Sequence, residues 1–262
     1  MEARTDIEVV RYMSGTIASE RCFEYVQAQA RLMNRVSHRA DHHPRVVTIS
    51  RQAGAGAHVV AEHLAERLQA ASDSSVPWKV FDRNLVEEVI EDHDLPERMA
   101  RFMPEDRISG ISDMFDELFD LRPSSSALVR KTADTVLHLA ELGNAVIIGR
   151  AGNLITRRIA GAFHVRLVGS LENRIAHIEE YLDLDPSAAS EYVRTQDLGR
   201  RRYVEAYYSE DIDDPLSYDL VINTDRIPYS EAARIIAEAG FARWETVPGG
   251  SGSGRMNEPV HV

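Results

Sequence analysis

Gly54 and Gly56 stand in a short loop whose composition could bind phosphate. The loop follows a β-branched run at 46–49, which predicts a buried strand. It precedes apolar residues at helical spacing from 60 to 68. Loop N–H groups and a helix N-terminus together present positive partial charge to an anion. The order strand, glycine loop, helix therefore indicates a phosphate site.

The loop matches the strict phosphate-binding pattern only in part. That pattern is Gly, four residues, then Gly-Lys-Ser/Thr. With Gly56 as its second glycine, Arg51 replaces the first, Ala57 replaces the lysine, and His58 replaces the hydroxyl residue that would hold Mg²⁺. A dinucleotide fingerprint would need a third glycine at Val59. The glycines alone leave a second interpretation open, a tight strand-to-helix turn.

A charged segment at 183–215 holds a second group of residues suited to phosphate. On a helix, Arg194, Asp197, Arg200 and Arg201 fall at three- and four-residue steps and share one broad face. Clustered guanidinium groups suit a polyphosphate. The alternative is ion pairing on a solvated helix.

Asp82 follows a short apolar run at 78–81 that predicts a second strand. Its carboxylate could cap the helix that follows. It could equally face a ligand hydroxyl, because strand ends border the binding crevice in open α/β sheets. Both interpretations stay open.

Five strands are predicted, at 46–49, 78–81, 145–148, 163–168 and 218–222, with helices between them. This alternation predicts an α/β fold, a three-layer, five-stranded parallel sheet with right-handed crossovers. Residues 94–143 show helical periodicity without a strand, which is too long for an ordinary crossover and indicates an inserted helical subdomain. We also expect a helix at 19–36 before the core, and a last helix from Ser230 to about 238.

Composition restricts the classes of partner. The 262 residues carry a net charge of −12, which argues against a general nucleic-acid binder. The one cysteine, Cys22, excludes an internal disulfide framework and fits a reducing compartment. No apolar run approaches 18 residues and no signal peptide is evident. We expect a soluble, cytoplasmic protein with neither nucleic-acid nor membrane partners.

Taken together, these features resemble the nucleoside monophosphate kinases, and most closely the cytidylate kinase-like family, over about 45–239. The resemblance rests on the order and spacing of several segments, none of which is specific alone. They are ISRQAGAGAH, FDRNLVEEV, IIGRAGNLI, HVRLVGSLENRI, DLGRRRYVEAYY and YDLVINT.

The resemblance implies a P-loop kinase-like domain at 45–240, with a helical NMP-binding insert at about 83–143 and a lid at about 183–215. A helical extension at 1–44 would precede this domain. A Gly/Ser-rich tail at 241–262, for which we expect disorder, would follow it.

The resemblance also implies roles for particular residues. In phosphoryl transfer, the reaction of such kinases, the protein mainly positions the substrates and neutralises charge. Donor phosphates would be bound by Arg51, Gln52, Gly54, Ala55, Gly56, Ala57 and His58, and the acceptor by Asp82, Arg130 and Arg150. Arg174 would contact phosphate from the lid side, and Arg194, Arg200 and Arg201, oriented by Asp197, would be the catalytic residues.

Departures from the family pattern at three positions bear on activity. Ordinary cytidylate kinases have Lys at the position of Ala57 and Ser or Thr at that of His58, and an aspartate at that of Ala151. Some members of the cytidylate kinase-like group place a basic residue one position after the missing lysine, which His58 partly imitates. A histidine is a weaker substitute than an always-charged residue.

The expected function is transfer of the γ-phosphoryl group of ATP to a nucleoside monophosphate or related small acceptor, with CMP the first choice. Mg²⁺ is expected, although the sequence identifies no protein ligand for it. The alternative is a non-catalytic nucleotide or phosphometabolite sensor. Such a sensor would act through a protein partner. For either function we expect a homo-oligomer or a protein partner to bind through the N-terminal helix. An NAD-type enzyme fits less well, because the arginine-rich segment has no role in it.

Overall fold

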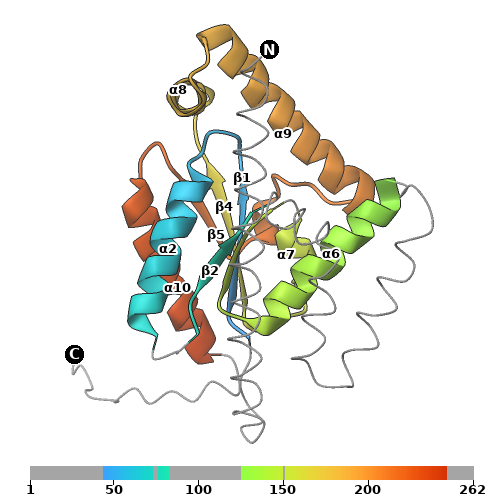
Figure 1. Ribbon diagram of the computed structural model, residues 1–262, viewed down its shortest axis with the longest axis vertical. Helices are drawn as coiled ribbons and strands as arrows, with labels where there is room; N and C mark the ends of the chain where they lie inside the picture. The colour runs from blue at the N-terminus through green and yellow to red at the C-terminus, as the bar shows by residue number, and fades with distance from the viewer. Residues whose placement is uncertain (1–43, 73–75, 83–124, 150, 247–262) are drawn as a thin grey trace, which may run out of the picture.

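A computed structural model describes residues 44–72, 76–82, 125–149 and 151–246 (Figure 1). The predicted helix at 19–36, the insert before residue 125 and Arg150 lie outside the described residues. The part of the tail beyond residue 246 also lies outside them.

The described chain builds one parallel sheet of five strands in the order β2-β3-β1-β4-β5. The strands are β1 (Val46–Arg51), β2 (Lys79–Phe81), β3 (Ala145–Ile148), β4 (Ala162–Val168) and β5 (Leu220–Asn223). All five predicted strands are confirmed, with ends shifted by at most two residues. The connection after β1 runs toward β2 at one edge of the sheet, whereas the connection after β3 crosses to β4 on the other side of β1. A ligand is therefore expected in the crevice at the carboxyl ends of the adjacent strands β1 and β3.

Helices cover both faces of the sheet and complete the predicted three layers (Figure 1). On one face lie α2 (Ala57–Ala71) and α10 (Tyr229–Thr246), and on the other α6 (Ser125–Leu142) and the single turn α7 (Gly152–Ile155). The largest core joins α2 and α10 to the strands through fully buried side chains such as Val47, Leu64 and Ile236. Each such side chain contributes roughly 1.5–3 kcal/mol by leaving water. Helix α6 confirms the helical periodicity predicted for 94–143 in the part of that segment that the structure describes.

The last helix is longer than predicted. It continues past residue 238 to Thr246, so the first six residues of the expected tail are helical. Trp244 explains the extension, because its ring is 3% exposed and stacks on Trp78 with 5.7 Å between centroids. Its Nε1 donates a hydrogen bond of 2.8 Å to the carbonyl of Gly161.

Two further helices, α8 (Leu171–Leu182) and α9 (Pro186–Tyr208), stand above the carboxyl edge of the sheet. The side chain of Asp185 caps α9 and Pro186 occupies its first turn, an arrangement that favours helix initiation. Ala53, Ile178 and Val193 share a buried apolar cluster that packs both helices against the glycine loop. Figure 1 shows α9 passing from α8 toward α6, over the region where the strands end.

Over the described ranges, no helix has an apolar stretch long enough to cross a bilayer.

Candidate functional site

The two loop glycines are required by backbone geometry and packing. Gly54 and Gly56 have φ of +81° and +73°, in the left-handed region that favours glycine. A Cβ on Gly54 would lie 2.3 Å from the carbonyl oxygen of Arg174, and one on Gly56 would lie 2.3 Å from the ring of Tyr229. The tight-turn interpretation therefore explains both glycines, and evidence for a ligand must come from the surroundings.

The backbone donors of the loop divide into two groups. The N–H of Gln52 donates to Leu167 O at 3.0 Å, and that of Ala53 donates to Oδ1 of Asp197 at 2.7 Å. The N–H groups of Gly54 and Gly56 have no partner within the described residues, and both glycines line a cavity. These two groups can donate to an anion beside the N-terminus of α2.

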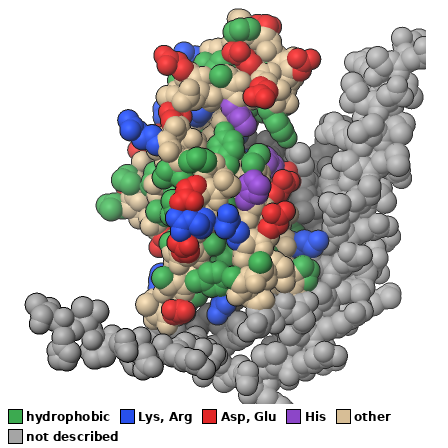
Figure 2. All heavy atoms as spheres, turned by 90° about the vertical axis from the view of Figure 1, so that its left-hand side faces the viewer, with side chains coloured by type: hydrophobic (Ala, Val, Ile, Leu, Met, Phe, Trp, Pro, Cys, Tyr) green, Lys and Arg blue, Asp and Glu red, His purple; other side chains and the backbone are tan. Residues whose placement is uncertain are grey.

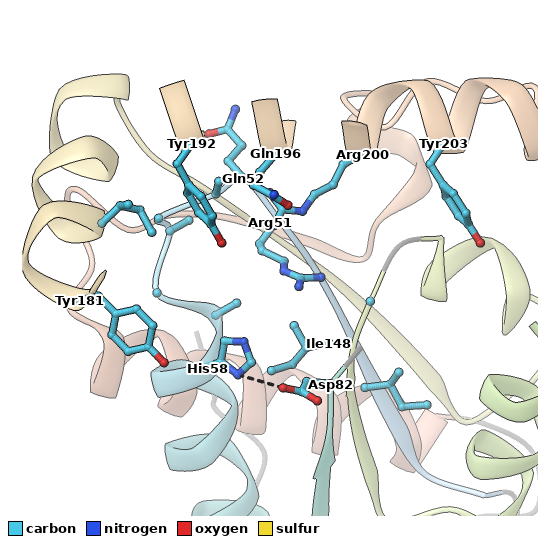
Figure 3. Close-up of a pocket in the computed structure, with 18 of the residues that line it drawn as sticks. Arg51, Gln52, His58, Asp82, Ile148, Tyr181, Tyr192, Gln196, Arg200 and Tyr203 are labelled. Carbon is cyan, nitrogen blue, oxygen red and sulfur yellow. Dashed lines mark ion pairs between the residues drawn. The ribbon is translucent and has the colours of Figure 1, made fainter. Parts of the chain in front are cut away.

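The cavity holds about 580 Å³ and lies over the carboxyl ends of β1 and β3, beneath α9 (Figure 3). That volume suits a small-molecule ligand. Its lining comes from the glycine loop, the start of α2, the ends of three strands, and helices α6, α8 and α9. The lining residues are Arg51 to Val59, Asp82, Val129, Thr132, Val136, Ile147 to Gly149, His177, Ile178, Tyr181, Leu182, Tyr192, Gln196, Arg200, Tyr203 and Tyr207.

Arg51 and Arg200 supply the permanent positive charge of the cavity wall, among the residues that the structure describes. Figure 3 shows Arg51 extending from the end of β1 and Arg200 descending from α9, between Tyr192 on one side and Tyr203 on the other. Both arginines also line a second, smaller cavity of about 40 Å³. The glycine loop lies on one side of this pair, and β3 and α6 lie on the other.

His58 faces the β2 side of the cavity. Its Nδ1 lies 3.9 Å from an oxygen of Asp82, and Figure 3 marks this contact with a dashed line. The side chains are 51% and 26% exposed, so the interaction is screened by water. Asp82 therefore lines the cavity, and the imidazole of His58 stands there in place of the motif's hydroxyl.

Asp197 links α9, the lid helix, to the glycine loop. Its Oδ1 accepts the Ala53 N–H, and its Oδ2 accepts a 2.6 Å hydrogen bond from Nη1 of Arg174. Arg174 is buried and also donates to the carbonyls of Gly169 and Ala53, both at 3.0 Å. The structure thus places Arg174 behind the loop, where it clamps the loop and α9 together, and not in the wall of either cavity.

Arg200 and Arg201 have different partners. Arg200 donates to Asp197 at 3.3 Å, whereas Arg201, 60% exposed, donates to Asp213 at 2.8 Å. Asp213 also accepts from Arg166, a residue of β4 that is 4% exposed. Burial raises the pKa of Asp213, but the hydrogen bonds and charges of Arg201 and Arg166 outweigh it and hold the pKa below its usual value. Arg201 therefore lies beside the small cavity, outside the large one.

Arg166, which lines the small cavity, and four tyrosines of the large cavity were not predicted from the sequence. Besides its contact with Asp213, Arg166 donates to Ser50 Oγ at 2.9 Å and lies over the ring of Tyr218. A charged residue inside an apolar strand was the signal that could have marked it. Four tyrosines from α8 and α9 line the large cavity and provide flat surfaces suited to an aromatic ring. They are Tyr181, Tyr192, Tyr203 and Tyr207.

The structure brings most of the predicted residues together. The large cavity contains Arg51, Gln52, Gly54, Ala55, Gly56, Ala57, His58, Asp82 and Arg200. Arg130 is exposed on α6 and Arg194 is exposed on α9, and neither lines either of the two cavities described above. Ala151 is 2% exposed and packs in an apolar cluster with Val204 and Ile212.

Metal-binding side chains are not concentrated in the part of the chain that the structure describes. No group of three or more His, Cys, Asp and Glu residues in it could hold a metal ion. The position that would supply a hydroxyl to Mg²⁺ carries His58.

A central parallel sheet, a left-handed glycine turn before α2 and a lid helix over the strand ends define a P-loop kinase-like fold. The chain belongs to the cytidylate kinase-like family, whose model matches residues 46–226.

Individual relatives are more distant. Uronate isomerase of Corynebacterium glutamicum is 27% identical over 120 residues, which are 46% of this chain. The chain spans 23% of that protein. An uncharacterised protein from Eubacterium ventriosum has 18% identity and a TM-score of 0.51, over 76% of this chain and 99% of that one. A shikimate kinase from Bacteroides thetaiotaomicron has 12% identity and a TM-score of 0.39, over 77% and 96%. The likeness to the Eubacterium protein is one of fold alone.

Proposed function

We propose that the protein is a phosphotransferase that moves the γ-phosphoryl group of a nucleoside triphosphate to a nucleoside monophosphate. ATP is the first choice of donor and CMP the first choice of acceptor. One observation carries this proposal. A single cavity of about 580 Å³ connects the glycine loop to Asp82 and the end of β3, and the arginines at its centre are Arg51 and Arg200. Two nucleotides that meet end to end need such an arrangement, with positive charge where their phosphates approach.

The donor would occupy the loop side. The N–H groups of Gly54 and Gly56, which have no partner among the described residues, and the N-terminus of α2 favour a triphosphate there. Mg²⁺ would reduce the charge of the triphosphate. Because no cluster of protein ligands exists within the described ranges, we expect phosphate oxygens and water to supply most of its coordination.

The acceptor would occupy the side formed by β2, β3 and α6. The carboxylate of Asp82 accepts hydrogen bonds, and the exocyclic amine of cytosine is a donor of the kind that a carboxylate binds. Tyr203 and Val136 add apolar surface for a base. These contacts are the reason for placing CMP first.

In the transfer, an oxygen of the acceptor phosphate forms a bond to the γ-phosphorus. The bond from that phosphorus to the β–γ bridging oxygen breaks, and its electron pair stays with the departing ADP. The acceptor phosphate is largely ionised at neutral pH, so no general base is needed. The side chains of Arg51 and Arg200 would hold the oxygens of the γ-phosphoryl group while charge spreads over them.

A second function is favoured by a specific observation. Ala57 offers no ammonium group, and the Ala53 N–H of the glycine loop is bound by Asp197 of the lid helix. A protein whose lid contact competes with a ligand could report nucleotide binding to a protein partner without transferring a phosphoryl group.

Calorimetry and product analysis distinguish the two functions. ATP and GTP are titrated with and without Mg²⁺, alone and with CMP, dCMP, UMP or AMP, and the mixtures are analysed for ADP and nucleoside diphosphate. Transfer predicts both products in equal amounts. Binding without products favours the sensor, and no binding at millimolar concentration refutes both.

A further inference from the structure

We infer that Arg51 performs the role of the missing P-loop lysine, holding the β- and γ-phosphates of the donor. This inference rests on the proposed phosphoryl transfer. It assigns a guanidinium group at the end of the central strand to a task that the strict motif gives to the first turn of the helix.

The position of the motif lysine cannot supply charge in this chain. Ala57 is the first residue of α2, is 6% exposed and belongs to the main apolar core. The next residue does not replace the charge at the same place, because the His58 ring lies 3.9 Å from Asp82, on the β2 side of the cavity.

Strand geometry directs Arg51 toward the loop. Side chains alternate between the two faces of a strand. Val47 and Ile49 belong to the core shared with α2 and α10, so Arg51, two residues further on, leaves β1 on the same face as they do. That face continues into the glycine loop and α2. Figure 3 shows the Arg51 side chain pointing into the cavity, between the loop and Ile148.

The two cavity arginines differ in how they are held. Arg200 belongs to α9 and donates to Asp197, so its position depends on the lid helix. Arg51 is the last residue of β1 and pairs with Leu167 of β4, so its backbone is held by the sheet and not by α9. A guanidinium group can also donate two parallel hydrogen bonds to phosphate oxygens. Arg51 can therefore bind the donor before the lid acts, as a P-loop lysine does.

The test compares the wild type with Arg51→Ala, Arg51→Lys and the double variant Arg51→Ala/Ala57→Lys. Arg157→Ala is the matched control, because Arg157 is 62% exposed, lies 3.9 Å from Glu210 and lines neither cavity. ATP affinity is measured by calorimetry, transfer by product analysis, and folding by thermal denaturation.

We expect Arg51→Ala to weaken ATP binding at least ~10-fold and to slow transfer by ~10², the size of losing a charge-stabilising donor. Arg51→Lys keeps a charge and should lose less. A lysine at position 57 in the Arg51→Ala background should restore part of both quantities, which a purely structural role for Arg51 would not allow.

Two outcomes would overturn the inference in distinguishable ways. If the wild type transfers phosphoryl groups and Arg51→Ala equals it and the control, the assignment of Arg51 is wrong and the proposed function stands. If the wild type binds no triphosphate, the proposed function and the assignment both fail.

Discussion

Replacing Asp197 with asparagine should detach the lid helix from the glycine loop. The carboxylate accepts the Ala53 N–H at 2.7 Å and the Arg174 Nη1 at 2.6 Å, one on each oxygen. Asparagine can keep the first acceptor, but its NH₂ group would then face the guanidinium of Arg174. Two donors would meet at a buried position, where the Arg174 side chain is 8% exposed.

The expected cost follows from how each partner is buried. Removing one member of a fully buried ion pair costs roughly 3–5 kcal/mol. Asp197 is 27% exposed, and Arg174 keeps the carbonyls of Gly169 and Ala53, so we expect about 2–3 kcal/mol. For a chain of this size each kcal/mol lowers the Tm by roughly 2–4 °C. The Asp197→Asn variant should therefore melt roughly 4–12 °C below the wild type.

Urea unfolding and thermal denaturation at neutral pH measure this loss. Glu238→Gln is the control, because the Arg234–Glu238 pair has a comparable separation of 2.7 Å but a glutamate 64% exposed. Figure 2 shows acidic and basic side chains close together on the face of the molecule formed by α2 and α10. An exposed pair of this kind is screened by water and contributes little to stability. If Asp197→Asn destabilises no more than Glu238→Gln, Asp197 does not clamp the loop.

Three further predictions address the lid, the loop and the core. Arg200→Ala should slow phosphoryl transfer at least ~10²-fold and Arg201→Ala less than ~10-fold, because Arg200 lines the large cavity whereas Arg201 pairs with Asp213. Equal steady-state rates in the two variants would contradict these different roles of the two arginines. Gly56→Val should destabilise the fold by roughly 2–4 kcal/mol in thermal denaturation, because the φ of Gly56 is +73° and a Cβ there would meet the Tyr229 ring. A change in ATP binding by this variant would therefore not show that Gly56 contacts phosphate. Burial lowers the pKa of His164 more than Asp219 raises it, so the folded protein keeps this imidazole neutral while the unfolded chain protonates near its ordinary pKa of about 6.5. Stability should then fall as the pH drops below about 6.5, and urea unfolding should show less of this loss in His164→Gln.

The fold could be predicted because most strands are short, largely apolar runs that contain several β-branched residues. The spacing of apolar residues in the sequence, however, did not locate the end of α10. Gly240 and the charged residues around it weaken the helical pattern beyond residue 238. Packing overrides this, because a Cβ on Gly240 would lie 3.3 Å from the Trp244 ring, so glycine makes room for the tryptophan. Local helix propensity does not account for tertiary contacts of this kind, which can override it.

The candidate site could be predicted where its residues are contiguous, as in the glycine loop. The lid arginines could not be separated by spacing alone. Consecutive helical residues differ by about 100° in direction, since a turn has 3.6 residues. That step sends Arg200 toward Asp197 and Arg201 toward Asp213, and Asp213 lies outside the helix itself.

The placement of charge explains how a P-loop fold could bind a triphosphate with Ala57 in its loop. In the strict motif the lysine extends from the start of the helix, beside the backbone donors. Here the described cavity takes its permanent positive charge from Arg51 at the end of β1 and from Arg200, which descends from α9 above it. The backbone of Arg51 belongs to the sheet, whereas Arg200 belongs to α9 and is held there by Asp197. Triphosphate affinity should therefore follow Arg51, and the rate of transfer should depend on both arginines. A site that had lost its function would show neither dependence.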